Sequence, residues 1–473
     1  MFKFIKNKSF YANLFLIMLA VVEVLAFLYN TFSWHLNIDE REHLYSSYMI
    51  YNGYMPYRDF FQHHHPLLWY VFAPFLIWFK NSHLIWYVLR GFGVVINVGI
   101  LYFIYKLGKF TGLNKKEAIV GGLLYFLFEA VWSGGKEFRP DNLGILFFIA
   151  GIYYFFCYVE KTDFRKLVVS YVLFFLSFMT MQKIVMSLIV MGGIILFLPR
   201  DNKNIKKELG WLVVPICGIL AYVGYMYFEG ALKDYFELNW LLNLKLTVVG
   251  ILYRRTIFIV PVLISLICVC FIKSSNYYCR ALIIMLWAQV AIVLWYAPYF
   301  HYFLPLYPFL VILIAYVSKR LFDKKDIIIF SFFIMAGIGR FLYWFNSYYA
   351  VYLSSFVRLT KVELSLSDEN DEIIPGDIWT GGLRKNALGY YWYGWSVSLL
   401  DYKLFKRHEF PDINKIIKEK KPKIIAHIDA VMLGCLNEKN EQDLGNCKTL
   451  QKIDKSLLEG DYMVSDFIYL RKY

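Results

Sequence analysis

Several signatures of nucleotide-dependent enzymes are missing from this sequence of 473 residues. It contains no P-loop, no G-x-G-x-x-G turn and no Asp-x-Asp pair of the kind that holds a metal on a nucleotide-sugar. A donor substrate held by one of these loops is therefore not expected. The N-terminal apolar run also lacks a small-residue cleavage site, so it is predicted to stay as a first membrane span.

Acidic residues are few relative to basic ones: 36 Asp and Glu stand against 50 Lys and Arg, which gives a net charge of +14. Such a charge can indicate nucleic-acid binding, but no basic stripe with interleaved aromatic residues occurs. The lysines lie in short loops between apolar runs, a placement typical of membrane-topology signals. No nucleic-acid partner is expected.

Cysteine is scarce, with seven residues, and five of these lie within apolar runs or at the edge of one. Only Cys435 and Cys447 fall in the polar C-terminal region. Outside the cytoplasm two such cysteines can pair, and whether they form a disulfide is left open.

Apolar residues are abundant instead: 59% of the chain is hydrophobic, 20% is aromatic, and the mean hydropathy is +0.47. Apolar runs of about 15–25 residues, the length of a membrane span, recur along the first 345 residues. The sequence therefore predicts a polytopic α-helical membrane protein with about eleven transmembrane helices. These are expected near residues 10–29, 84–105, 118–132, 143–159, 167–180, 184–198, 211–228, 257–272, 281–297, 303–317 and 327–345.

The loop charges predict the orientation of these spans. Clusters of basic residues, from Lys3, Lys6 and Lys8 to Lys324 and Lys325, all fall on one side, which the positive-inside rule identifies as the cytoplasm. The N-terminus is then inside and the C-terminus outside. The apolar run 67–79 is about 13 residues long and contains Pro74, so it is predicted to be an interfacial or re-entrant helix. The first outer loop, residues 31–83, then lies on the outer face.

The composition changes after the last span. Residues 346–473 carry charged clusters, turn signals and short alternating runs, which predict a small extracytoplasmic α/β domain behind a transmembrane domain of residues 1–345. Within it, residues 413–420 predict an amphipathic helix, 424–428 a buried strand, and 461–470 a final strand.

The stretch 37–80 concentrates carboxylates, histidines and arginines beside the membrane. Asn37 and Glu40 match a capping box, and Gly53 is a helix stop. A helix between them places Asp39, Glu42 and His43 along one side, because residues three and four apart are neighbours. Acids at a helix start also complement the helix dipole, which is the purely structural alternative.

These residues belong to a recognisable pattern. An Asp-Glu pair at residue 39, a helix, Gly-Tyr-Met-Pro-Tyr-Arg-Asp-Phe-Phe from residue 53 and His-Pro-Leu-Leu from residue 65 resemble the first outer loop of GT-C glycosyltransferases that use lipid-linked sugars. The branch most similar contains the protein O-mannosyltransferases and the lipid A aminoarabinose transferases. Arg139-Pro140-Asp141, Lys183 and residues 299–305 also fit, so the resemblance covers most of the membrane part.

By this resemblance Asp39 is the catalytic base, which takes a proton from the acceptor hydroxyl as that oxygen attacks the sugar. Relatives often carry a second acid before the His-Pro segment, where this chain has Gln62 and three histidines. That role falls to Asp59 or Glu40.

The leaving phosphate needs fixed positive charge, although lysines and arginines at span ends also snorkel without a catalytic role. A divalent metal is left open as a cofactor, with Asp59, His63 and His301 as candidate ligands, because imidazole suits zinc. The residues expected to bind substrate are His43, Arg58, His63, His64, His65, Arg139, Asp141, Lys183, Arg254, Arg255, His301 and Tyr302.

The pattern predicts an inverting glycosyltransferase that moves a sugar from a polyprenyl-phosphate carrier to a lipid, glycan or protein acceptor outside the cytoplasm. A composition rich in Lys, Ile, Tyr and Phe fits a bacterial chain, hence a bacterial cytoplasmic membrane with the active site on its outer face. Alternatives are a transporter or flippase of envelope glycolipids, which places charges near the bilayer midplane, and a polymerase or ligase of surface polysaccharide.

Overall fold

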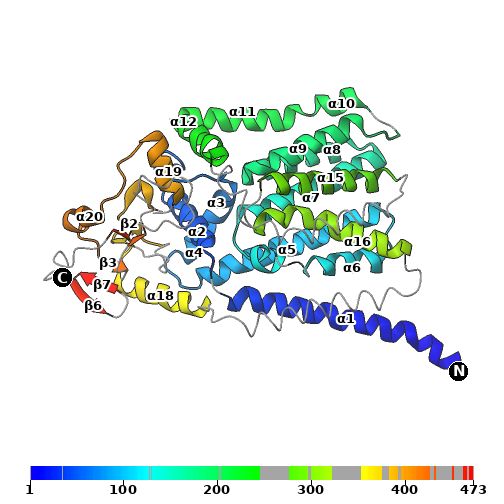
Figure 1. The fold of residues 1–473 in the computed structure, drawn as a ribbon, viewed down its shortest axis with the longest axis horizontal. Coiled ribbons are helices and arrows are strands. Elements are labelled where there is room, and N and C mark those ends of the chain that lie inside the picture. The colour runs from blue at the N-terminus through cyan, green and yellow to red at the C-terminus, as the bar shows by residue number, and fades with distance from the viewer. Residues whose placement is uncertain are drawn as a thin grey trace. The chain divides into compact units, whose positions relative to one another are not determined.

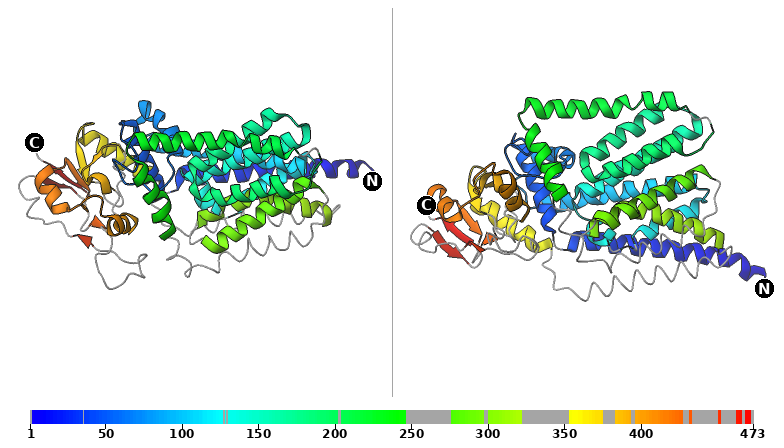
Figure 2. Two further views of the ribbon diagram at one scale, coloured as in Figure 1. Left: turned by 90° about the horizontal axis from the view of Figure 1, so that it is seen from above. Right: turned by 45° about the horizontal axis from the view of Figure 1, so that its top comes forward.

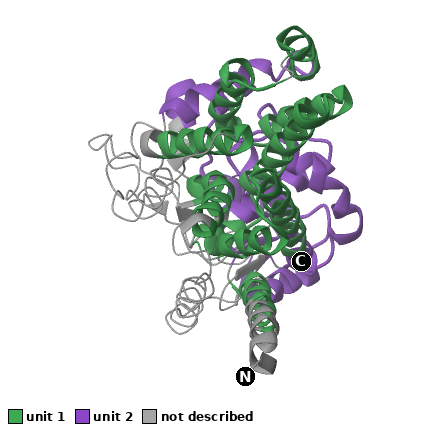
Figure 3. Cartoon of the chain, turned by 90° about the vertical axis from the view of Figure 1, so that its right-hand side faces the viewer, with its two compact units in different colours: residues 1–34, 90–220, 251–350 green, residues 35–89, 221–250, 351–473 purple. Residues whose placement is uncertain are grey.

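The computed structural model of the chain forms two compact units (Figure 3). Unit 1 comprises residues 1–34, 90–220 and 251–350, and unit 2 comprises residues 35–89, 221–250 and 351–473. The structure describes residues 2–34, 36–126, 128, 130–201, 204–245, 276–296, 300–321, 353–374, 383–392, 396–426, 431–432, 450–451, 462–465 and 468–471.

Unit 1 is a bundle of helices, and the axes of its core helices are roughly aligned (Figures 1 and 2). Within it α7 packs along α8, α6 along α16, and α9 along α15. Its elements are α1 (Phe2–Ser33), α5 (Ile85–Phe110, from residue 90), α6 (Lys115–Tyr125), the π-helix η2 (Val131–Gly135), α7 (Pro140–Lys161), α8 (Phe164–Thr180), η3 (Gln182–Ile184), α9 (Val185–Phe197), α10 (Ile205–Gly210), α11 (Val213–Phe228, to residue 220), α15 (Tyr277–Tyr296), η5 (Phe300–Leu306) and α16 (Tyr307–Leu321).

Small residues let α7 and α8 approach closely. The Ser170 hydroxyl donates to the Gly151 carbonyl at 2.8 Å, and the Ser177 hydroxyl donates to the Gly144 carbonyl at 2.7 Å. A Cβ at Gly144 would meet the side chain of Met181 at 3.2 Å, so the larger side chain has little room there. Small residues with a cross-helix hydroxyl are typical of helix pairs inside a membrane.

The chain is a polytopic helical membrane protein. Among the described residues, four helices are long and apolar enough to cross a bilayer: Ile85–Phe110, Pro140–Lys161, Ile205–Phe228 and His301–Lys319. The predicted spans 257–272 and 327–345 lie outside the described residues, so the number of eleven and the orientation stay predictions.

One predicted span is wrong as a single helix. The run 118–132 begins in α6, but α6 ends at Tyr125 and the π-helix η2 follows from Val131. A Cβ at Gly134 in this π-helix would meet Leu304 of η5 at 3.2 Å, so the interruption accompanies a close approach between η2 and η5. Single π-helical turns of this kind are frequent at functional sites.

Unit 2 contains the first outer loop and the C-terminal region. The run 67–79 forms two short α-helices joined by a 3₁₀ turn that contains Pro74. Its interfacial position stays a prediction. The helices of this unit are α2 (Ile38–Tyr51), α3 (Leu67–Phe72), η1 (Ala73–Phe75), α4 (Leu76–Phe79), α12 (Leu232–Phe236), the π-helix η4 (Glu237–Leu242), α18 (Leu353–Leu366), η6 (Gly389–Tyr391), α19 (Ser396–Phe405) and α20 (Ile413–Lys420), and the ends of α5 and α11 up to residue 89 and from residue 221.

A five-stranded sheet in unit 2 has the order β2-β1-β3-β7-β6. β1 pairs in parallel with β2 and β3, whereas β7 pairs antiparallel with β3 and β6. A separate pair joins β4 (Val431–Met432) to β5 (Leu450–Gln451). The sheet strands are β1 (Glu372–Ile374), β2 (Lys385–Asn386), β3 (Ile424–Ala426), β6 (Tyr462–Ser465) and β7 (Ile468–Arg471).

The predicted helix 413–420 is confirmed as α20, capped by the Asp412 side chain, and the predicted strand from residue 424 is confirmed over the part that the structure describes. The predicted strand 461–470 is wrong, because it is two strands: β6 and β7 form a hairpin in which Ser465 pairs with Ile468. The boundary at residue 346 and both Cys435 and Cys447 lie outside the described residues.

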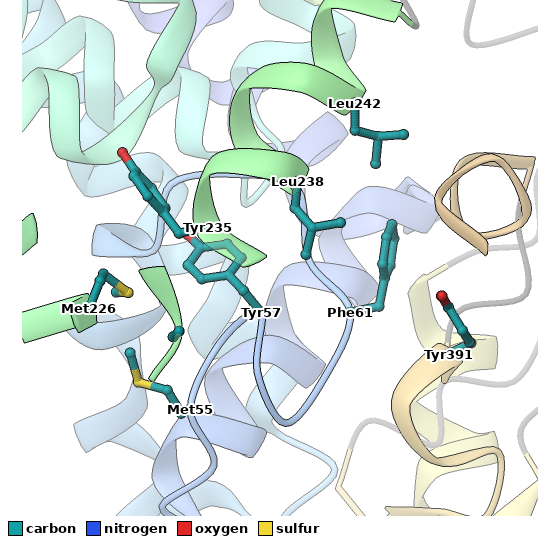
Figure 4. Packing of buried hydrophobic residues seen from close by; sticks show 9 residues of the cluster. Met55, Tyr57, Phe61, Met226, Tyr235, Leu238, Leu242 and Tyr391 are labelled. Atoms are coloured by element: carbon teal, nitrogen blue, oxygen red, sulfur yellow. The ribbon is translucent and has the colours of Figure 1, made fainter. Parts of the chain in front are cut away.

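A hydrophobic cluster connects three distant parts of unit 2 (Figure 4). It joins Met55, Tyr57 and Phe61 of the first outer loop to Tyr235 and Leu238 of the segment after α11, and to Tyr391 of η6. The Trp392 indole also donates to the Phe61 carbonyl at 3.1 Å. The first outer loop is therefore held by residues 170 to 331 positions away in the chain.

Glu363 gives unit 2 a testable pH dependence. Its side chain on α18 is 1% exposed, and burial raises the pKa of the carboxyl to about 7 although Arg384 opposes the shift. The folded state therefore binds the proton more tightly than the unfolded state, and stability falls as pH rises from about 4.5 to about 7. We expect Glu363→Gln to abolish this fall and to stabilise the protein by about 3 kcal/mol at pH 8. Melting temperatures of the purified protein between pH 5 and pH 8 measure it, with exposed Glu419→Gln as the matched control; parallel curves for Glu363→Gln and the native chain would contradict it.

Candidate functional site

The candidate base lies in the first turn of α2. The Asn37 side chain caps the helix, and the Asn37 backbone N–H donates to the Glu40 carboxylate at 3.0 Å, which confirms the predicted capping box. Gly53 after the helix has φ +83°, a left-handed conformation that glycine adopts without strain. Glu40 is fully buried in its capping role, whereas Asp39 is half-buried. These contacts fix the start of the helix that carries Asp39.

One face of α2 meets the histidine run. The Trp69 indole donates to His43 Nδ1 at 3.1 Å, and the His43 and His64 rings lie 5.2 Å apart. Burial lowers the pKa of His63 to about 4, while the charge of Asp39 acts in the opposite direction. His43 and the charge of Asp39 therefore both lie close to the histidine run in unit 2.

Residues from other parts of unit 2 form hydrogen-bond contacts with the histidine run, His63 to His65. The Tyr57 hydroxyl donates to the His64 carbonyl at 2.8 Å, and the Asn243 amide donates to the His63 carbonyl at 2.8 Å. The Tyr235 hydroxyl lies 3.2 Å from His65 Nε2. Tyr57 is fully buried with φ +71°, in a region that costs a non-glycine residue energy, and such strained residues cluster at functional sites.

Asp59 has a structural environment. Its carboxylate accepts hydrogen bonds from the Met55 backbone N–H at 2.7 Å and from Arg58 Nε at 2.8 Å. The hydrogen bond from Arg58 lowers the pKa of Asp59. Arg58 also donates to the carbonyl of Glu229 at 2.7 Å. The two predicted residues thus close a turn and join it to the end of α11, and a catalytic role for Asp59 stays a prediction.

In unit 1 the predicted site residues Arg139, Asp141 and Lys183 lie close together. Arg139 Nε lies 3.5 Å from the Asp141 carboxylate, and Arg139 also contacts the Glu137 carboxylate at 3.1 Å. Lys183, in the short turn η3, forms an ion pair with Asp141 and lies 3.9 Å from the centre of the Tyr302 ring. The N-terminal end of α7, the α8–α9 turn and η5 supply these groups.

A small pocket lies beside Lys183 in unit 1. Its wall is mostly apolar, and it includes a buried polar pair in which the Gln289 amide donates to the Ser187 hydroxyl at 2.6 Å. Among the other predicted residues, His301 lies in η5, and Arg254 and Arg255 lie outside the described residues.

Comparison with known protein families finds a match over part of the chain that agrees with the resemblance the motifs predict. Residues 63–228 match the family model described as dolichyl-phosphate-mannose-protein mannosyltransferase. The matched range contains the histidine run, Arg139, Asp141 and Lys183, and it begins after Asp39.

A solved structure of ArnT from Cupriavidus metallidurans, bound to undecaprenyl phosphate, is similar with 11% sequence identity and a TM-score of 0.48. The likeness covers 82% of this chain and 77% of that one. No curated protein matches the chain.

Proposed function

We propose that the chain is an inverting glycosyltransferase that moves one sugar from a polyprenyl-phosphate donor to an acceptor hydroxyl outside the cytoplasm. The observation that carries the proposal is the family match over residues 63–228, directly behind the acid-bearing helix α2. The apolar helices make it an integral membrane protein, and the loop charges favour an outer-face site in a bacterial cytoplasmic membrane.

In this proposal Asp39 is the general base. Its carboxylate accepts the proton of the acceptor hydroxyl while the acceptor oxygen bonds to the anomeric carbon. The bond from that carbon to the phosphate oxygen breaks, and its electron pair leaves with the phosphate. Asp39 suits the task because it is half-buried on a helix whose start is fixed by a capping box.

The reaction also needs positive charge for the leaving phosphate, and unit 1 contains candidate cations for this role. A phosphodiester that becomes a monoester gains negative charge, which a fixed cation stabilises more strongly than it stabilises the starting donor. We infer that Lys183 binds this phosphate, since it lies in a short turn between two apolar helices and beside apolar side chains such as Ile184 and Val293. Arg139 and Asp141 hold Lys183 in place through their buried ion pairs.

Incubation of the purified protein with a panel of labelled polyprenyl-phosphate sugars tests the proposal. We expect one donor to be consumed with release of polyprenyl phosphate, and the Asp39→Asn variant to leave that donor intact. The transporter alternative predicts a different result in proteoliposomes, where intact donor lipid would cross the bilayer without loss of its sugar. That result, with no donor consumed, would reject the glycosyltransferase.

A further inference from the structure

Three carboxylates of unit 2 converge on one guanidinium. Arg407, which follows α19, forms ion pairs with Asp234 of α12 and with Glu237 at the start of the π-helix η4. Its Nε lies 3.5 Å from the carboxylate of Asp401 in α19. The Arg407 side chain is only 9% exposed, and that of Asp401 is fully buried. These four residues, here called the Arg407 cluster, join segments about 170 residues apart in the chain.

The segment α12–η4, on one side of the Arg407 cluster, contacts the histidine run. The hydroxyl of Tyr235 in α12 lies 3.2 Å from His65 Nε2. Asn243, which follows η4, donates its side-chain amide to the His63 carbonyl at 2.8 Å. The segment that Arg407 binds through two ion pairs therefore contacts both ends of the run.

The turn η6, on the other side of the Arg407 cluster, holds the residue just before the run. The Tyr391 hydroxyl of η6 donates to the Asp401 carboxylate at 2.9 Å. The Phe61 backbone N–H donates to the Tyr390 carbonyl at 3.0 Å, and the Trp392 indole donates to the Phe61 carbonyl at 3.1 Å. Both backbone groups of Phe61 are thus bound by the turn that Asp401 anchors.

We propose that Arg407 is a positioning residue, which joins α12–η4 to α19 and η6 and thereby holds the histidine run in one arrangement. An arginine suits this task because its planar guanidinium presents five N–H donors and can bind several carboxylates at once. Without the cation, Asp234, Glu237 and Asp401 repel one another, so the two segments lose the contact that joins them. The run lies close to the charge of Asp39. An effect of Arg407 on sugar transfer rests on the proposed function, whereas its effect on the loop does not.

Hydrogen exchange of the full chain in detergent, read by mass spectrometry of peptides, tests the positioning without any donor. In Arg407→Met we expect peptides that cover residues 57–66 to exchange at least about tenfold faster than in the native chain. Peptides that cover residues 413–426 should keep their native exchange, because Ile413, Ile417 and Ile425 pack in a separate hydrophobic cluster. Arg358→Met removes an arginine that is exposed on α18 and should leave both regions unchanged.

Two further variants separate the geometry of the contact from its charge. Arg407→Lys keeps the positive charge but not the planar fork, so it should recover only part of the protection of residues 57–66. Tyr391→Phe removes one hydroxyl and breaks the contact between η6 and Asp401, so it should give a smaller acceleration in the same peptides. Because it deletes a single oxygen, this variant tests the proposal even if Arg407→Met does not fold.

Native exchange of residues 57–66 in both Arg407→Met and Tyr391→Phe would overturn the proposal. Equal acceleration of residues 413–426 would also overturn it, because that result indicates general destabilisation. If a donor is consumed, kcat for Arg407→Met should fall by about tenfold to a hundredfold, the cost of misplacing reacting groups from a distance. Faster exchange of the loop with no donor consumed by the native chain supports the role of Arg407 and rejects the transferase. Native exchange and full donor consumption by Arg407→Met reject the role of Arg407 alone.

Discussion

Replacement of Asp39 by asparagine is expected to lower the rate of sugar transfer about a thousandfold, within the range that a positioned general base contributes. The amide keeps the size and shape of the side chain but cannot accept the proton of the acceptor hydroxyl. Its structural cost should be small, because a half-buried carboxylate in the first turn of a helix contributes at most about 2 kcal/mol through the helix dipole. Turnover of the donor that the purified protein consumes measures the effect.

The matched control is Asp163→Asn. Asp163 caps α8 by accepting a hydrogen bond from the Arg165 backbone N–H at 3.0 Å, and asparagine makes the same cap. Its turnover should equal that of the native chain. Affinity for the donor should be nearly unchanged in Asp39→Asn, because the base acts on the acceptor. Full activity of Asp39→Asn would count against the whole assignment of the first outer loop.

Local patterns explain what the sequence predicted well. The capping box from Asn37 to Glu40 and the helix stop at Gly53 both depend on residues within a few positions, and both are present. The helix 413–420 was predictable for the same reason, since its apolar face repeats with the period of a helix. The separation into β6 and β7 was missed because residues 461–470 form one largely apolar run without Gly, Pro or Asn.

Contacts between residues that are far apart in the sequence could not be predicted from such local patterns. Tyr235 and Asn243 hold the histidine run from positions 170 and 180 residues away, and neither belongs to a motif. Glu42 was expected along one helix side with Asp39 and His43, but its convergence with His63 and His64 emerged only from the fold. The sequence thus indicated which loop carries chemistry, and packing decided which side chains meet within it.

Lys183 was predicted from the sequence to bind substrate, and in the structure it lies beside Asp141 and Tyr302. Its replacement should have the second-largest effect on the rate of sugar transfer. We expect Lys183→Met to lower kcat/KM for the donor about a hundredfold, because a preorganised positive group at a developing anion is worth about 10²–10³ in rate. Lys183→Arg should recover part of the loss. Lys166→Met is the control, since Lys166 also lies over a tyrosine ring, that of Tyr154 at 5.6 Å, and should keep native activity.

A second variant separates phosphate binding from simple neutralisation of Asp141. Lys183→Met alone leaves the buried Asp141 carboxylate with Arg139 at 3.5 Å as a remaining partner, and uncompensated buried charge destabilises a protein. The double variant Lys183→Met with Asp141→Asn restores the charge balance. Its melting temperature should return toward that of the native chain while kcat/KM stays low, because the donor phosphate still lacks its cation. Recovery of kcat/KM in the double variant would show instead that Lys183 serves only to neutralise Asp141.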